Sequence, residues 1–183
     1  MRLVLLGPSG AGKGTQAQRL SHYLGVPHVS TGDLFRRHVE LGSPLGERAR
    51  SFLDAGELVP DDVTAGMLAQ RLAEPDAQRG FLLDGFPRTL PQAEVLSAML
   101  DRKGLSLRTV LELQVPEDVL TARLLGRGRA DDTKEVILHR QAVYRSQTAS
   151  LLSYYRDVLV SVEADGTIDD ITTRIWSALH LPA

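Results

Sequence analysis

Cysteine and asparagine are absent from this chain of 183 residues, and lysine occurs only at positions 13, 103 and 134. The lack of cysteine excludes disulfide bonds and zinc sites built from thiolates. A net charge of -2 gives no electrostatic footprint for nucleic acid or an anionic membrane. No apolar run has the length of a membrane span or of an export signal. These absences predict a cytoplasmic protein whose partners are neither nucleic acids nor membranes.

The most informative stretch is Gly7-Pro-Ser-Gly-Ala-Gly-Lys13-Gly-Thr15, which lies between an apolar run at residues 3–6 and a helical pattern at residues 16–24. A strand, a glycine loop and a helix in that order are typical of a phosphate-binding loop. Glycines let successive backbone N–H groups point at one anion, and the helix N-terminus adds partial positive charge. Lys13 supplies a full charge, and Thr15 offers a hydroxyl to phosphate or magnesium. The alternative is a glycine-rich turn that only joins a strand to a helix.

Five short apolar runs alternate with helical patterns, at residues 3–6, 26–30, 81–83, 110–115 and 158–162. This alternation predicts an α/β fold with a five-stranded parallel sheet covered by helices on both faces. Ligands of such sheets bind beyond the carboxyl ends of the strands. Two stretches stand outside the alternation. Residues 31–59 carry two short helical patterns broken at residues 42–44, and residues 126–132 form a short polar loop between two helices.

Several charged residues follow the predicted strands. Asp84 ends a buried apolar run, where a carboxylate is costly unless it is paired or hydrated around a metal. We interpret Asp84 and Asp33 as acids of a magnesium water shell, with a helix cap as the alternative for each. Arg123 and Arg127 share a helix face, Arg129 follows, and such guanidinium forks suit phosphate oxygens. A salt-bridged helix end is the alternative for these arginines.

The histidines offer no comparable signal. The five histidines show no spacing typical of metal ligands. We expect each of them, His28 included, to be an ordinary surface or partly buried residue.

Five motifs in order carry a resemblance to a known family. They are Gly7 to Thr15, Ser30-Thr-Gly-Asp-Leu-Phe-Arg36, Leu83-Asp-Gly-Phe-Pro-Arg88, Arg123-Leu-Leu-Gly-Arg127 and Arg129-Ala-Asp-Asp132. Over essentially its whole length the chain resembles an adenylate kinase. The resemblance implies a P-loop NTPase-type core (residues 1–30, 60–122 and 135–183), an NMP-binding insertion (residues 31–59) and a short lid (residues 123–134).

The resemblance also implies a reaction and a set of roles. The reaction is the reversible transfer of the γ-phosphoryl group of ATP to AMP, giving two ADP, by a monomer that uses Mg²⁺ and holds no structural zinc. The residues implied for ATP are Gly10, Ala11, Gly12, Lys13, Gly14, Thr15, Arg123, Arg127 and Gly166. Those implied for AMP are Thr31, Arg36, Glu57, Leu58, Val59, Gly85, Arg88, Gln92, Arg129 and Arg140. Lys13, Arg88, Arg123, Arg129 and Arg140 are the implied catalytic residues, and Asp84 and Asp33 the implied magnesium acids.

Three rival functions are weighed against the sequence. UMP/CMP kinases share the short lid but typically have alanine in place of Thr31 and asparagine in place of Thr89. The amide of Gln92 suits the N1 and N6 positions of adenine, with an ordinary surface helix residue as the alternative. Shikimate-type kinases usually lack the glycine between the lysine and the hydroxyl residue. A GTPase-like switch needs an asparagine in its guanine motif, and this chain has none.

Overall fold

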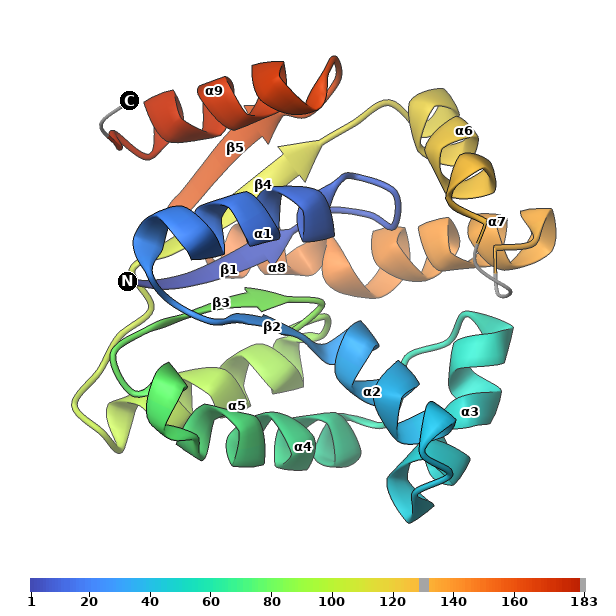
Figure 1. The fold of residues 1–183 in the computed structure, drawn as a ribbon, viewed down its shortest axis with the longest axis horizontal. Coiled ribbons are helices and arrows are strands. Elements are labelled where there is room, and N and C mark those ends of the chain that lie inside the picture. Colours follow the sequence, from blue (N-terminus) through green and yellow to red (C-terminus); the bar gives the residue numbers. More distant parts are fainter. Residues whose placement is uncertain (129–131, 182–183) are drawn as a thin grey trace.

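The protein is described by a computed structural model that covers residues 1–128 and 132–181. Its centre is a five-stranded sheet in the order β2-β3-β1-β4-β5, with every neighbouring pair parallel. The strands are β1 (Arg2–Leu6), β2 (His28–Ser30), β3 (Phe81–Asp84), β4 (Thr109–Gln114) and β5 (Leu159–Glu163). Figure 1 shows helices on both sides of this sheet. The predicted α/β fold with five parallel strands is confirmed.

The helices fall into three groups. Helices α1 (Lys13–Leu24) and α9 (Ile168–Ala178) cover one face of the sheet, and α4 (Asp61–Ala73), α5 (Leu90–Asp101) and α8 (Ser150–Tyr154) cover the other. Helices α2 (Thr31–Glu40) and α3 (Pro44–Ala55) lie beside the sheet, opposite α6 (Glu117–Arg127) and α7 (Lys134–Val143). A 3-10 turn at Pro75–Ala77 and a π-helical turn at Tyr144–Thr148 complete the set. Within the described ranges, no helix is both long and apolar enough to cross a bilayer.

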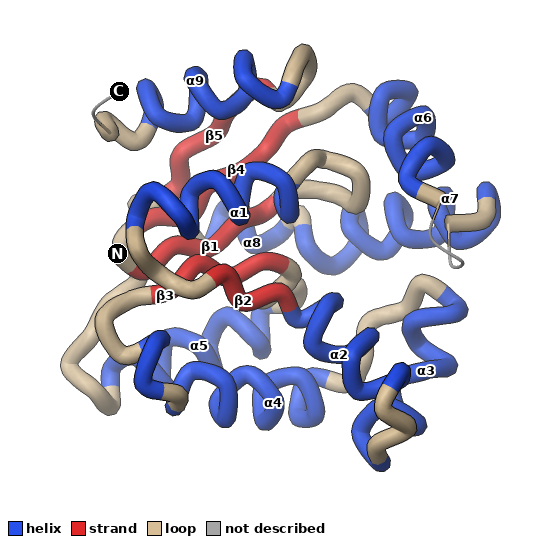
Figure 2. The backbone as a smooth tube through the Cα atoms, in the orientation of Figure 1, coloured by secondary structure: helices blue, strands red, loops and turns tan. Residues whose placement is uncertain are grey.

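Strand β1 explains how the sheet is buried on both faces. Leu3 and Leu5 pack with α1 and α9 in one apolar cluster, whereas Val4 and Leu6 pack with α4, α5 and α8 in another. Successive side chains of a strand point to opposite faces, so a strand covered on both sides must be apolar throughout. Because all the strands run the same way, the loops that follow them lie along one edge of the sheet (Figure 2). That edge is where the predicted polar segments gather.

The two helical patterns predicted for residues 31–59 are confirmed as α2 and α3. The Ser30 and Ser43 side chains cap the two helices by accepting backbone N–H groups of their first turns. Phe35, Ala49 and Met67 form a small apolar cluster apart from the two faces of the sheet. The two helices also approach closely, because a Cβ on Gly46 would lie 2.1 Å from the His38 carbonyl oxygen. The division of the chain into core, insertion and lid stays a prediction.

The strand ends differ from the sequence prediction by one or two residues, and two of the differences in element boundaries have a clear physical cause. Strand β2 begins at His28, two residues later than residues 26–30 suggested, because Pro27 has no N–H with which to extend the ladder. The loop predicted at residues 126–132 begins later, because α6 continues through Gly126 to Arg127 and is capped by Gly128 at φ 69°.

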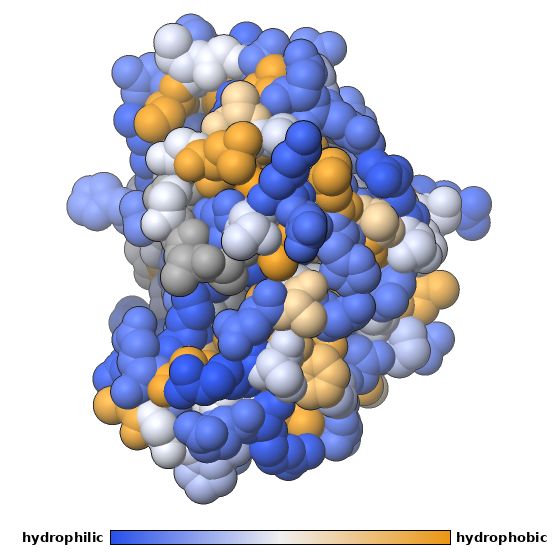
Figure 3. Space-filling view, turned by 90° about the vertical axis from the view of Figure 1, so that its right-hand side faces the viewer, coloured by the Kyte–Doolittle hydropathy of each residue, from blue (hydrophilic) through white to orange (hydrophobic). Residues whose placement is uncertain are grey.

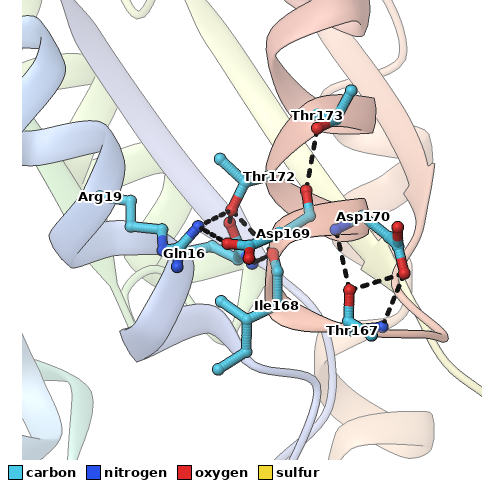
Figure 4. Close-up of polar contacts among 8 residues, drawn as sticks. All are labelled: Gln16, Arg19, Thr167, Ile168, Asp169, Asp170, Thr172 and Thr173. Atoms are coloured by element: carbon cyan, nitrogen blue, oxygen red, sulfur yellow. Dashed lines mark hydrogen bonds and ion pairs between the residues drawn. The ribbon is translucent and has the colours of Figure 1, made fainter.

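A polar junction fixes α9 against α1 (Figure 4). Gln16 of α1 donates to the Ile168 carbonyl at 3.0 Å and accepts from the Thr172 hydroxyl at 2.9 Å. Thr167 and Asp170 form a capping box at the start of α9. Since Gly166 directly precedes this cap, the junction holds the Gly166 loop at a set distance from the glycine loop that begins α1.

Candidate active site

A cavity of about 490 Å³ opens at the edge where the strands end. Its walls are the glycine loop, the starts of α1 and α2, the end of α3, the segment after β3, and side chains of α6 and α7. Figure 3 shows that this side of the molecule is mainly hydrophilic, with small hydrophobic areas between the polar ones. The predicted residues that line the cavity are Gly10, Gly12, Lys13, Gly14, Thr15, Asp33, Arg36, Glu57, Asp84, Gly85, Arg88, Arg123 and Arg140.

A small pocket adjoins the main cavity on the side of α2. It contains the remaining residues predicted for the acceptor base, Thr31, Leu58, Val59 and Gln92. Glu57, Gly85 and Arg88 line both spaces. The structure therefore brings most of the predicted donor and acceptor residues around two adjoining spaces.

The glycine loop has the backbone that the sequence predicts. Gly7, Gly10 and Gly12 have φ values of 137°, 87° and 89°, which favour glycine over other residues. A Cβ on Gly7 would lie 2.8 Å from the Leu113 carbonyl oxygen, so the loop also packs tightly on β4. At the start of α1, no side chain in the described part of the chain caps the helix. The first N–H groups of α1 therefore face the cavity, as an anion site requires.

Lys13 lies inside the curve of this loop. Its Nζ donates to the carbonyl oxygens of Gly7 and Pro8, both at 2.8 Å. These bonds place the ammonium beside the cavity and hold it in position. A lysine held this way supplies a fixed positive charge for a phosphate that enters the loop.

Asp84 ends β3 at the floor of the cavity. Burial disfavours its charged form, but His28 and the charges of Lys13 and Arg88 outweigh this effect and hold the pKa of the Asp84 carboxyl below its usual range. His28 Nε2 lies 3.5 Å from Asp84 Oδ2. Asp84 is thus an ionised, partly buried acid. The alternative that it caps a helix is wrong, because Thr89 caps α5.

Three arginines from separate helices and loops converge on the cavity. Burial lowers the pKa of the Arg88 guanidinium, and the positive charges of Arg140 and Arg36 lower it further, while Asp84 acts against them. Arg88 Nε donates to the Gly85 carbonyl at 2.9 Å. Like charges this close repel one another, so their arrangement favours a polyanion between them.

Gly85 organises the acceptor side. Its carbonyl oxygen accepts from the Thr31 hydroxyl at 2.8 Å as well as from Arg88. Its φ is 83°, and a Cβ there would lie 2.8 Å from Thr31 Oγ1. Glycine is therefore required at this position by both conformation and space.

Gln92 is buried, with 2% of its surface exposed. Its Oε1 accepts the Arg88 backbone N–H at 2.7 Å, and its Nε2 donates to Asp61 Oδ1 at 2.7 Å. The alternative that Gln92 is an ordinary surface helix residue is wrong. Its interpretation as the residue that reads adenine stays a prediction.

Helix α7 contacts the end of α3. Arg140 donates to the Asp132 carboxylate at 3.2 Å and to the Leu53 carbonyl at 3.3 Å. His139 Nε2 lies 2.6 Å from Glu57 Oε1. These contacts join α7, which brings Arg140 to the wall of the cavity, to the end of α3.

Asp33 does not cap α2, because Ser30 is the capping residue and accepts the Asp33 backbone N–H at 3.3 Å. Its carboxylate forms an ion pair with Arg36 and faces the cavity. The cap alternative is therefore wrong for Asp33 also, and its role as a magnesium acid stays a prediction.

Four of the predicted site residues are not shown at the cavity: Ala11, Arg127 and Gly166, predicted for ATP, and Arg129, predicted for AMP. Ala11 is fully buried, and its backbone N–H already donates to the Pro8 carbonyl at 3.2 Å. Gly166 does not line the cavity, although Arg123 reaches its loop by donating to the Ala164 carbonyl at 3.0 Å. Arg129 lies outside the described residues, as does the side chain of Arg127. Roles for these four stay predictions.

The carboxylate oxygens of the cavity fit one hydrated magnesium ion that is held jointly with phosphates. Mg²⁺ prefers oxygen ligands, keeps several waters, and is usually bound by one or two carboxylates together with substrate phosphates. Asp84, with its lowered pKa, supplies such a carboxylate beside the glycine loop. Among residues 1–128 and 132–181, no cluster of three or more acidic or histidine side chains forms an all-protein metal cage.

Sequence reasoning missed two residues of the site. His28 was expected to be ordinary, but it lines the cavity and contacts Asp84. Only the pairing of β2 with β3, in which Ser30 is in register with Asp84, brings His28 to this carboxylate. The second is Asp61, and no local pattern in the sequence indicates that its carboxylate contacts Gln92.

Comparison with known proteins decides the family. The family profile described as Adenylate kinase matches residues 5–160. The chain belongs to the adenylate kinase family. It is 58% identical to an adenylate kinase of Mycolicibacterium paratuberculosis, 56% to one of Corynebacterium glutamicum and 55% to one of Mycobacterium tuberculosis. Each comparison covers 98% of this chain and 99% of the relative. As a member of this family the chain is an enzyme, a nucleoside monophosphate kinase.

Proposed function

We propose that the cavity holds ATP and AMP together, so that the γ-phosphoryl group passes directly from one to the other and gives two ADP. The glycine loop, Lys13 and Arg123 bind the ATP phosphates, and the pocket of Thr31, Val59 and Gln92 receives the AMP base. The observation that carries the proposal is that Arg36, Arg88 and Arg140 converge on the same cavity that Lys13 lines. Two polyanions can meet only where such charges offset their repulsion.

The chemistry needs positioning more than proton transfer. An oxygen of the AMP phosphate attacks the γ-phosphorus, a new P–O bond forms, and the bond to the bridging oxygen of ADP breaks. The second pKa of a phosphate monoester is about 6, so the attacking group is already ionised at neutral pH and needs no general base. Arg88, Arg123 and Arg140 stabilise the charge that spreads over the transferring group. Arg129 is proposed to act with them.

Magnesium has a place in this arrangement. We propose that Asp84 and Asp33 hold the water shell of the Mg²⁺ that accompanies ATP, where the ion supplies neutralisation of phosphate charge. His28 and Lys13 keep Asp84 ionised for that purpose.

Water competes with AMP for the γ-phosphoryl group. An open cavity lets water take the γ-phosphoryl group. We propose that residues 31–59 and 123–134 move to close the site when both nucleotides bind. In support of this proposal, His139 and Arg140 of α7 already contact Glu57 and Leu53, which lie at the end of residues 31–59. Relaxation-dispersion NMR that finds no exchange in either segment would contradict this part of the proposal.

The reaction itself is tested with purified protein, ATP and Mg²⁺ supplied with AMP, CMP, UMP or GMP in turn. Chromatography of the products should show two ADP for each AMP consumed and far slower use of the other acceptors. A preference for any acceptor other than AMP contradicts the proposal.

We also propose that the chain works in the cytoplasm as a monomer, and the lining of both spaces by residues of one chain supports the monomer. Light scattering that shows a stable oligomer contradicts the proposal of a monomer.

A further inference from the structure

Asp61 joins the starts of α4 and α5 through a closed set of hydrogen bonds. Its Oδ1 accepts from Gln92 Nε2 at 2.7 Å, and its Oδ2 accepts from Thr89 Oγ1 at 2.9 Å. The Thr89 hydroxyl oxygen in turn accepts the Gln92 backbone N–H at 3.3 Å and caps α5. One carboxylate therefore holds two side chains of the neighbouring helix, and one of them lines the acceptor-base pocket.

These bonds determine which way round the Gln92 amide lies. The Arg88 backbone N–H can only donate, so its partner on Gln92 must be the amide oxygen. A carboxylate can only accept, so the partner of Asp61 must be the amide nitrogen. The two requirements agree, and a flipped amide would violate both of them. Gln92 is thus fixed in one orientation before any ligand enters.

A fixed amide presents its remaining hydrogen-bonding groups in a fixed order. One N–H of Nε2 and one lone pair of Oε1 are left after the bonds to Asp61 and Arg88. Adenine offers an acceptor at N1 beside a donor at its 6-amino group, which complements such a pair. Hypoxanthine offers the reverse, a donor at N1 beside an acceptor at O6, and complements only the flipped amide.

We propose that Asp61 is a specificity-determining positioning residue, which selects adenine over 6-oxopurines in the acceptor pocket by holding the Gln92 amide in one orientation. The inference rests on the proposed function, in which this pocket receives the AMP base. Asp61 is proposed to act through Gln92, which it contacts directly.

The variant Asp61→Asn keeps the Gln92 amide but weakens the hydrogen bond that fixes its orientation, so it tests the orientation alone. Asparagine at 61 can donate to a flipped Gln92 as well as accept from an unflipped one, so only the Arg88 N–H still opposes the flip. A hydrogen bond to a charged group is worth enough to change a ratio by about 10- to 100-fold. We therefore expect the selectivity for AMP over inosine monophosphate, measured as a ratio of kcat/KM values, to fall by at least about tenfold.

The control is Asp62→Asn, which removes the same charge one position along the same helix turn from an exposed side chain. Its AMP to inosine monophosphate ratio should equal that of the wild type. In a Gln92→Leu background, Asp61→Asn should leave the ratio unchanged, because the amide that it orients is gone. If Asp61→Asn does not fold, Asp61→Ser serves in its place, since a serine hydroxyl can also donate to the flipped amide.

The outcomes are distinguishable. A wild-type enzyme that uses the two monophosphates alike overturns the acceptor-pocket assignment on which the inference rests. A wild type that prefers AMP, with an Asp61→Asn ratio unchanged, overturns the inference and leaves the proposed function standing. Equal losses of kcat/KM for both acceptors show a structural role for Asp61 and overturn the inference also.

Discussion

The two sides of the cavity are built by different parts of the chain. On the proposed donor side, backbone groups of the glycine loop and the start of α1 face the ligand, and Lys13 is held by two carbonyls of the same loop. On the proposed acceptor side, the side chains of Thr31, Arg88 and Gln92 face the ligand, and each is held by residues distant in sequence or across a turn. Backbone N–H groups bind a phosphate whatever base the nucleotide carries, whereas side chains can form hydrogen bonds that distinguish one base from another. The donor side should therefore recognise phosphates, and the acceptor side should recognise the whole nucleotide.

Substitution of Lys13 should lower activity more than any other change on the donor side. Lys13→Met leaves the loop backbone in place but removes its only full charge, and we expect kcat to fall by about 10³-fold or more. The measurement is ADP formation at saturating ATP and AMP. Lys103→Met, at an exposed site, is the matched control. Wild-type rates in Lys13→Met would refute the glycine-loop assignment.

On the acceptor side, substitution of Arg88 should cause the largest loss of turnover. Arg88→Ala removes a positive charge that lies among Arg36, Arg140 and Asp84, and we expect turnover to fall by about 10³-fold. The fold should survive, because the substitution also relieves repulsion between the arginines. Thermal unfolding and turnover are measured together, with exposed Arg79→Ala as the control. Unchanged turnover in Arg88→Ala would contradict the proposal that Arg88 binds AMP.

A glycine substitution should affect the acceptor side alone. Gly46→Ala places a Cβ 2.1 Å from the His38 carbonyl oxygen, so α2 and α3 must move apart. We expect a destabilisation of about 1–3 kcal/mol and a raised KM for AMP with an unchanged KM for ATP.

Gly66→Ala provides the contrast for Gly46→Ala. A Cβ on Gly66 in α4 meets nothing within 4 Å, so this variant should be more stable by about 0.5–1 kcal/mol. Equal changes in both KM values for Gly46→Ala would show that the two sides are not independent.

The smallest effect concerns pH and Asp84, which lies between the two sides. The pKa of its carboxyl is below the ordinary value of 3.8 in the folded chain. A lowered folded pKa gives stability that is present above the ordinary pKa and is lost as pH falls through the folded pKa. As pH falls below the ordinary pKa of 3.8, the free energy of unfolding should therefore fall more steeply for the wild type than for Asp84→Asn. Exposed Asp101→Asn should follow the wild type, and identical slopes for Asp84→Asn and the wild type would contradict the shift.

The sequence predicts the donor side better than the acceptor side for a physical reason. The glycine loop is contiguous, so its spacing, its preceding strand and its following helix are all visible in residues 3–24. The five strands were found for the same reason, with errors of one or two residues at their ends. Asp61 and Gln92 are 31 positions apart, and their contact depends on how α4 and α5 start side by side.

His28 shows the same limit. Its role depends on the pairing of β2 with β3, which places it beside Asp84 across the sheet. Neither partner's neighbours in sequence indicate that contact. Residues 129–131 are outside the described ranges, so the predicted role of Arg129 rests on its motif alone.

One measurement tests the contrast between the two sides most directly. The kcat/KM values are determined for AMP, inosine monophosphate and GMP with ATP as donor, and for ATP, GTP and CTP with AMP as acceptor. A site that hydrogen-bonds a base rejects the wrong one strongly, so acceptor selectivity should reach about 10³-fold or more, whereas donor selectivity should stay within about tenfold. Donor bases discriminated as sharply as acceptor bases, or GMP used as well as AMP, would contradict the account.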